Sequence, residues 1–177
     1  MSDAASRAEG TVRAYYRAFN AGDVDGFLAQ LTDDVVHDIS QGGREIGRAA
    51  FRRFLEHMNR CYGEKIVDLT VMTEPTGRRA AAEFTVLGTY LATDTGLPPA
   101  RGQRYRLPAG AFFELRNGKV ARISNHYNFK DWLAQVGAGG PPRAARKAKK
   151  AKVGVGVKKS GAQKSKPARR AKPGRSR

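Results

Sequence analysis

The chain has 177 residues and a formal net charge of +17, with 33 Lys and Arg against 16 Asp and Glu. Fifteen of the basic residues lie in 143–177, which has no acidic or aromatic residue, so the preceding part is close to neutral. The single Cys excludes an internal disulfide, and no apolar run reaches the roughly 20 residues that cross a bilayer.

This shift in composition predicts one domain over residues 1–136 and a disordered basic tail over 137–177, rich in Lys, Arg, Ala, Pro and Gly. The first ten residues have no apolar segment typical of a secretory signal. Together with the lone Cys, this favours a cytoplasmic protein, with association with the nucleoid as a further option.

Helical patterns open the domain. Apolar side chains recur with helical spacing over 12–19, 24–31 and 51–58. Gly22 ends the first pattern, and Asp23 is a suitable N-cap for the second. Between the second and third patterns, residues 35–39 are typical of a short strand, followed by a Gly42-Gly43 turn.

Four strand patterns and a short helix complete the domain. The strands are expected over 66–72, 80–91, 104–116 and 119–128, and the helix over 130–136. Asn117-Gly118 is a strong hairpin signal between the last two strands. Helices followed by a meander of strands predict an α+β fold, in which the N-terminal helices pack on one face of a curved antiparallel sheet and form a cone with it.

Alternation along the strands predicts two faces for the polar residues. On the short strand, His37 and Asp38 point to opposite sides, and alternation alone leaves open which of them faces the pocket. Asn125 and Tyr127 share one side of the last strand. Glu83, with Thr85 on the same side, is expected to face the inside of the cone.

The domain resembles the cone-shaped nuclear transport factor 2-like and SnoaL-like superfamily, which includes ketosteroid isomerases, polyketide cyclases and limonene epoxide hydrolases. The resemblance lies in YYRAFNAGDVDGFLAQLTDDVVHDI and GKVARISNHYNFKDWLAQV. DDVVHDISQGG, GTYLATDTGLPPA and YRLPAGAFFEL are most similar to the bacterial ketosteroid isomerase-related branch. The resemblance covers the domain and not the tail. It implies a cone-shaped, cystatin-like roll with the N-terminal helices packed on the concave face of the sheet. It also implies a small hydrophobic ligand in the cone and a homodimer formed through the outer sheet face.

The resemblance also implies roles for individual residues. Tyr15 stands where ketosteroid isomerases place an oxyanion-hole Tyr. Their general-base position holds Ile39 here, with Asp38 one residue earlier. The charged triad of the epoxide hydrolases is replaced by Glu83, Thr85 and Asn125, which disfavours that reaction.

We therefore expect a catalytic set of His37, Glu83, Asp38 and Tyr15, and a substrate-binding set of Asn125, Thr85 and Tyr127. Structural roles remain open for each, namely a hydrogen-bonded core His, a salt-bridged Glu and a packed Tyr. No cofactor is expected. The three His and Cys61 lack metal-ligand spacing, so we expect no metal, and Cys61 is interpreted as a buried small hydrophobe.

Two functions are consistent with these residues. The first is an isomerase- or cyclase-type enzyme that moves a proton on a cyclic or polyketide-like substrate. The second is a non-catalytic ligand-binding or scaffold module. In both, the tail is expected to bind nucleic acid without sequence readout, as linker-histone tails do, while a solubilising extension or an anionic membrane contact are alternatives.

Overall fold

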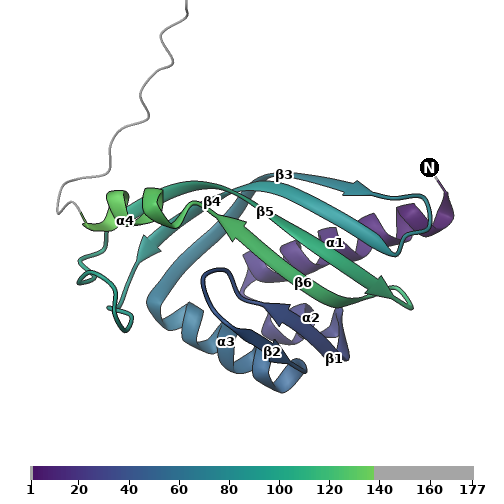
Figure 1. Cartoon of the computed structure of the whole chain (residues 1–177), viewed down its shortest axis with the longest axis horizontal. Coiled ribbons are helices and arrows are strands. Elements are labelled where there is room, and N and C mark those ends of the chain that lie inside the picture. Colours follow the sequence, from purple (N-terminus) through teal and green to yellow (C-terminus); the bar gives the residue numbers. More distant parts are fainter. Residues whose placement is uncertain (1, 138–177) are drawn as a thin grey trace, which may run out of the picture. The chain divides into compact units, whose positions relative to one another are not determined.

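The computed structural model describes residues 2–137 (Figure 1). Of the expected tail over 137–177, only Gly137 is described, as the last residue of a helix, and 138–177 lie outside the described residues. The division into a domain and a tail therefore remains a prediction. The elements are, in chain order, α1 (Asp3–Ala21), α2 (Val24–Ala29), β1 (Leu31–Asp38), β2 (Arg44–Ile46), α3 (Arg48–Cys61), β3 (Tyr62–Thr73), β4 (Arg79–Tyr90), β5 (Arg104–Arg116), β6 (Lys119–Tyr127) and α4 (Phe129–Gly137).

The strands form one six-stranded sheet in the order β2-β1-β6-β5-β4-β3. The predicted meander from β3 to β6 is confirmed, because each of these strands pairs antiparallel with the next. The sheet curves and stays open, and α1, α2 and α3 lie along one side of it, as Figure 1 shows. The α+β cone with N-terminal helices is thus confirmed. One pairing is parallel, that of β1 with β6.

Helix ends follow the local sequence. The Ser2 side chain accepts a hydrogen bond from the Ala5 N–H and caps α1. Gly22 ends α1 with a φ of 68°, in the left-handed region that favours glycine. Asp23 caps α2 by accepting from the Gly26 N–H, as expected. These two caps fix the sharp change of direction between α1 and α2.

The core lies between the helices and the concave face of the sheet. Tyr15 and Tyr16 of α1 are both buried and contact the ring of Phe113 on β5 edge-on. Phe27 of α2 packs on both Tyr15 and Phe51 of α3. Aromatic rings from three helices and the sheet therefore form one continuous apolar interior.

Three differences from the expected elements change the strands by more than a residue or two. Leu31 follows the helical spacing of α2 but opens β1, where it is fully buried and pairs with Val120. Strand β2, which was not predicted, is only three residues long and pairs with the end of β1. Strand β3 begins at Tyr62 rather than Ile66, because pairing with β4 extends regular structure through Gly63 and two charged residues.

Candidate functional site

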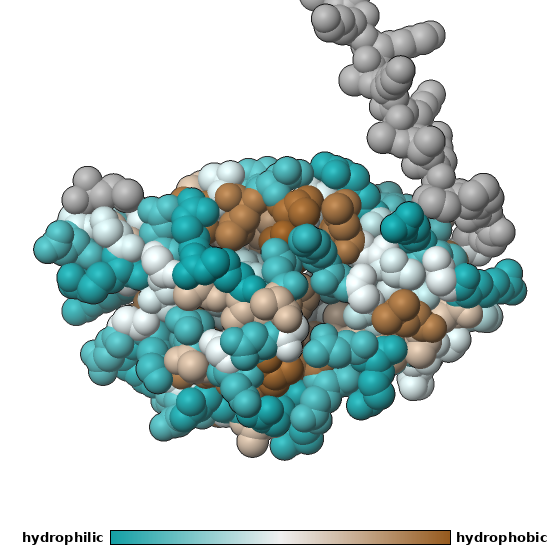
Figure 2. Space-filling model, turned by 180° about the vertical axis from the view of Figure 1, so that it is seen from behind, coloured by the Kyte–Doolittle hydropathy of each residue, from teal (hydrophilic) through white to brown (hydrophobic). Residues whose placement is uncertain are grey.

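A cavity of about 460 Å³ lies between the helices and the concave face of the sheet. Its walls are largely aromatic and aliphatic, including rings from α1, α2, α3 and α4. Seen from behind the view of Figure 1, the surface is mostly hydrophilic, and hydrophobic groups show only in separate areas (Figure 2). Because its walls are largely apolar, the cavity offers a bound molecule an environment in which its polar side chains have strong electrostatic effects.

His37 is the most deeply buried polar group of the cavity wall. Strand β1 directs it inward, where it is 1% exposed and stacks on Phe51 at 4.2 Å between ring centroids. Phe54 contacts its ring edge-on. Within residues 2–137 neither ring nitrogen has a hydrogen-bond partner. Burial lowers the pKa of His37 to about 4, so the imidazole is neutral near pH 7 and can donate one hydrogen bond.

Glu64 is one of two acidic residues that line the cavity, with Asp94, and sequence reasoning missed it. Its carboxylate Oε1 accepts a hydrogen bond of 2.5 Å from the Tyr105 hydroxyl. Burial raises the pKa of Glu64, and the hydrogen bond from Tyr105 opposes part of that rise. The missed signal was alternation. Had the strand been extended back to Tyr62, Glu64 would have shared the inward side with Ile66.

Further polar side chains line the cavity, among them three of the predicted residues. The predicted residues Tyr15, Asn125 and Tyr127 all do so, the last two from β6 as their alternation indicated. Tyr16, beside Tyr15 on α1, also lines it, and in the described part of the chain its buried hydroxyl has no hydrogen-bond partner. Burial raises the pKa of both tyrosines, so their hydroxyls stay protonated and serve as donors.

Glu83 and Thr85 do not reach the cavity, which corrects the expected face of β4. The inward residues of this strand are Phe84 and Val86. Glu83 is exposed on the outer face, and Thr85 lies under Arg106, whose guanidinium donates to its hydroxyl at 3.4 Å. The alternation of side chains along β4 was predicted correctly, but Glu83 and Thr85 were assigned to the inner face instead of the outer one. A core strand directs its large apolar residues inward.

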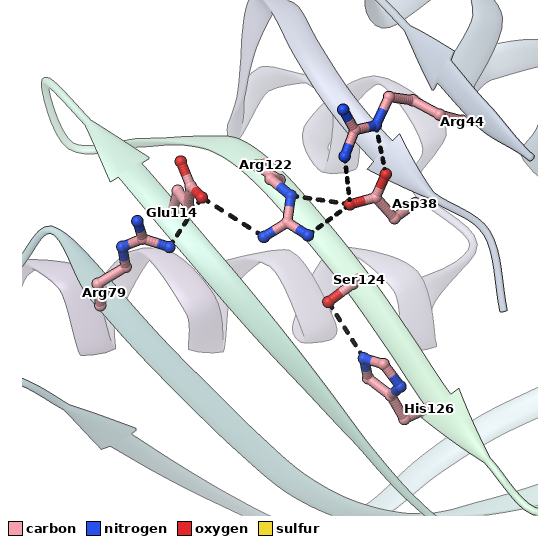
Figure 3. Close-up of polar contacts among 7 residues, drawn as sticks. All are labelled: Asp38, Arg44, Arg79, Glu114, Arg122, Ser124 and His126. Carbon is pink, nitrogen blue, oxygen red and sulfur yellow. Dashed lines mark hydrogen bonds and ion pairs between the residues drawn. The ribbon is translucent and has the colours of Figure 1, made fainter.

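Asp38 also lies on the outer face, in a chain of ion pairs that crosses the sheet (Figure 3). Its carboxylate accepts hydrogen bonds from Arg44 at 2.6 Å and from Arg122 at 2.8 Å. Arg122 also contacts Glu114, which pairs with Arg79 at 2.7 Å. The hydrogen bond from Arg44 is the largest cause of a lowered Asp38 pKa. Of these two neighbouring residues on β1, His37 therefore faces the cavity and Asp38 faces the outside of the sheet.

A second hydrogen-bonded group lies on the cavity wall between α3 and the segment after β4. Asp94 Oδ2 accepts from the Tyr62 hydroxyl at 2.9 Å and lies 2.9 Å from His57 Nε2. His57, Tyr62 and Asp94 all line the cavity. Sequence analysis missed the group because its members come from separate segments.

The fold and the cavity define the class of protein, an α+β cone with an apolar interior. The model of the SnoaL-like domain family matches residues 12–123. The chain belongs to this family, as its resemblance predicted. No curated protein matches the chain.

Solved structures agree with this assignment. A candidate polyketide cyclase from Pseudomonas putida KT2440 is 57% identical, with a TM-score of 0.72, covering 77% of this chain and 98% of its own. One from Xanthomonas campestris pv. campestris is 52% identical, with a TM-score of 0.73, covering 75% and 98%. One from Silicibacter sp. TM1040 is 49% identical, with a TM-score of 0.71, covering 73% and 94%. The narrower placement in the ketosteroid isomerase-related branch remains a prediction.

No described helix of the chain has the length and apolar character to cross a membrane.

Proposed function

We propose that the protein is a proton-transfer enzyme of the isomerase or cyclase type, acting on a small, mostly apolar, cyclic or polyketide-like molecule in the cavity. The observation that carries the proposal is Glu64, a carboxyl group with a raised pKa on the wall of an apolar cavity, oriented by Tyr105. A raised pKa makes a carboxylate a stronger base and brings it closer to the operating pH. The solved relatives described as candidate polyketide cyclases support the same substrate class.

The proposed reaction begins at a carbon next to a carbonyl group. The Glu64 carboxylate takes a proton from that carbon, the C–H electron pair moves into an enolate, and the negative charge gathers on oxygen. Neutral His37, the Tyr16 hydroxyl and Asn125 are the available donors to that oxygen. The proton on Glu64 then returns to another atom of the substrate. Alternatively, the enolate carbon attacks a second carbonyl to close a ring, the π electrons of that carbonyl move to its oxygen, and the resulting alkoxide takes the proton from Glu64.

His37 keeps a place in this proposal with a changed role. The sequence suggested that it moves a proton near neutral pH. With a pKa of about 4, it is instead a neutral donor, because the imidazole holds its N–H throughout the physiological range. Tyr127 remains proposed as a contact of the substrate, and Tyr15, which was expected to be a catalytic donor, is proposed to contact the substrate as well, since both line the cavity.

The test separates binding from chemistry. Trp132, the only Trp of the chain, lines the cavity, so its fluorescence reports binding. Exchange of the α-protons of a cyclic ketone such as 2-tetralone in D2O, followed by NMR, reports proton abstraction. In Glu64→Gln we expect exchange to fall about 100-fold or more while binding changes little. Glu83→Gln, on the outer face, is the matched control. Equal exchange by Glu64→Gln and the wild type would refute the proposal.

The alternative is a non-catalytic module that holds an apolar ligand. The same walls favour it, since they supply far more apolar than polar contact. It predicts quenching of Trp132 by cyclic ketones with exchange at the rate of buffer alone, in the wild type as in Glu64→Gln.

A second copy of the chain is proposed to cover the outer face of the sheet. Met72 is 50% exposed and Phe112 is 58% exposed, and both pair with Ala81 in the sheet, so they form one apolar row. Exposed apolar rows on a sheet face are typical of interfaces. Phe112→Lys should convert a dimer to a monomer in sedimentation equilibrium. A wild type that already sediments as a monomer would refute this.

Nucleic-acid binding is proposed for the basic stretch 143–177, on the charge of its sequence. Its fifteen Lys and Arg would release counterions from a phosphate backbone, without reading base sequence. Deleting residues 138–177 should abolish binding to random duplex DNA in a mobility-shift assay at low salt. DNA binding that survives the deletion would refute the role.

A further inference from the structure

Three side chains with metal-ligand chemistry meet where α3 ends beside the segment that follows β4. A nitrogen of His57, the Cys61 sulfur and a carboxylate oxygen of Asp94 all lie within 4.8 Å of one another. His57 and Cys61 are four residues apart on α3 and so share one side of the helix. Sequence analysis expected no metal because it considered His and Cys alone, and Asp94 lies more than thirty residues further along the chain.

We propose that His57, Cys61 and Asp94 form a binding site for a divalent transition-metal ion, with Zn²⁺ as the ion that fits best. Imidazole, thiolate and carboxylate are all zinc ligands, with bonds of roughly 2.0–2.3 Å. Such bonds place ligand atoms about 3.5 Å apart, so small side-chain rotations close the observed spacing. A thiolate ligand disfavours Mg²⁺ and Ca²⁺, which take oxygen ligands.

Hydrogen bonds from neighbouring groups hold the proposed ligands in place, as they commonly do around metal sites in proteins. Asp94 Oδ2 accepts a hydrogen bond from the Tyr62 hydroxyl at 2.9 Å, and Asp94 Oδ1 accepts from the Thr95 N–H at 2.7 Å. The Leu91 N–H donates to the Cys61 carbonyl at 2.8 Å and joins the segment after β4 to the end of α3. Two ligand-bearing segments are therefore fixed against each other by backbone contact.

The charges balance when the ion binds. Cys61 is a free, buried thiol, and it loses its proton to solvent as the sulfur–metal bond forms. One thiolate and one carboxylate then neutralise a divalent ion. The exposed Arg60 contacts His57 Nδ1 at 3.3 Å and has to turn into solvent, because metal at Nε2 places the imidazole proton on Nδ1.

The proposed ion would sit on the cavity wall, because His57 and Asp94 line the cavity. His57 is 41% exposed, which leaves a path from solvent. Three protein ligands leave a fourth tetrahedral position open, the arrangement of zinc sites that accept an outside oxygen. This site does not depend on the proposed role of Glu64.

The test uses Co²⁺ as a spectroscopic probe of the metal-free, tag-free full chain. Because Cys61 is the only Cys, a thiolate-to-cobalt charge-transfer band identifies it as a ligand. We expect one equivalent of Co²⁺ to give this band, Zn²⁺ to displace it, and one proton to be released per ion at pH 7. Cys61→Ser and His57→Ala should abolish the band, and Tyr62→Phe should weaken binding about 10-fold.

His126→Ala is the matched control, because His126 lies on the outer side, hydrogen-bonded to Ser124 (Figure 3). It should leave the band unchanged. The absence of a thiolate band in the wild type would overturn the proposal, and so would a band that persists in both His57→Ala and Asp94→Asn. Since His57 is partly exposed, His57→Ala should fold even if the buried Cys61→Ser does not.

Discussion

The ring of Tyr105 crosses directly over Gly88. A Cβ atom at position 88 would lie 2.0 Å from Cζ of that ring, closer than any real contact. Gly88 on β4 pairs with Glu64 on one side and with Tyr105 on the other. The missing side chain therefore opens the path along which the Tyr105 hydroxyl reaches Glu64.

Gly88→Ala should break the hydrogen bond between Tyr105 and Glu64. The displaced ring has to leave its position, at a cost of about 1–3 kcal/mol in the free energy of unfolding. The loss should be smaller in a Tyr105→Ala background, as a double-mutant cycle by urea denaturation can measure. Gly10→Ala is the control, because a Cβ there meets no atom within 4 Å. Equal losses in both backgrounds would contradict the packing argument.

Stability should depend on the charge state of His37. Its pKa falls from 6.5 to about 4 on folding, so between these values the unfolded chain binds a proton that the folded chain does not. Stability is therefore lost as the pH falls from 6.5 towards 4, by about 3 kcal/mol. His37→Phe removes this contribution, so urea midpoints of wild type and variant should diverge over that range. Parallel curves would show that His37 titrates normally.

The contribution of Glu64 to stability should change with pH in the opposite direction to that of His37. Its pKa is raised on folding, so the folded state prefers the protonated form. This contribution to stability is fully present at a pH below the pKa of Glu64 in the unfolded chain. It is lost as the pH rises through the higher pKa of Glu64 in the folded chain. Glu64→Gln should thus become more stable relative to the wild type as the pH rises from 4 to 8. Wild type gaining on the variant over this range would reverse the assignment.

Asp38→Asn should change stability and leave the cavity unaffected. The substitution weakens pairing with Arg44 and Arg122 on the outer face, where partly exposed ion pairs contribute about 1 kcal/mol or less. Binding followed by Trp132 fluorescence and ketone proton exchange should equal those of the wild type. A large loss of exchange would return Asp38 to the catalytic role that its sequence position suggested.

Much of the fold could be predicted from the sequence because its signals are local. The boundaries of β5 match those expected, since Asn117-Gly118 ends it in a tight hairpin and its apolar alternation is regular. The pairing register of the strands is harder to predict, because it depends on residues that are distant in the sequence. The start of β3 depends on pairing with β4 across the sheet, and no local signal marks Tyr62 as the first residue of a strand.

The candidate site was predicted in part for the same reason. Asn125 and Tyr127 lie on a regular strand where alternation gives the correct side. Alternation also separated His37 from Asp38, but it left open which of the two faces the cavity. Alternation separated Glu83 from Phe84 but could not say which of them faces inward, because that depends on where the helices lie. The His57 and Asp94 pair joins segments distant in sequence, which only the folded chain brings together.

The parallel pairing of β1 with β6 has a consequence for synthesis of the protein. During translation β1 emerges early, yet its inner neighbour in the sheet is the last strand to be made. Until Val120 and Ile123 arrive, Leu31 and His37 have no strand on that side, and one wall of the cavity is missing. A ribosome that stops before Lys119 therefore releases an open sheet edge rather than a smaller working domain, and such edges invite aggregation.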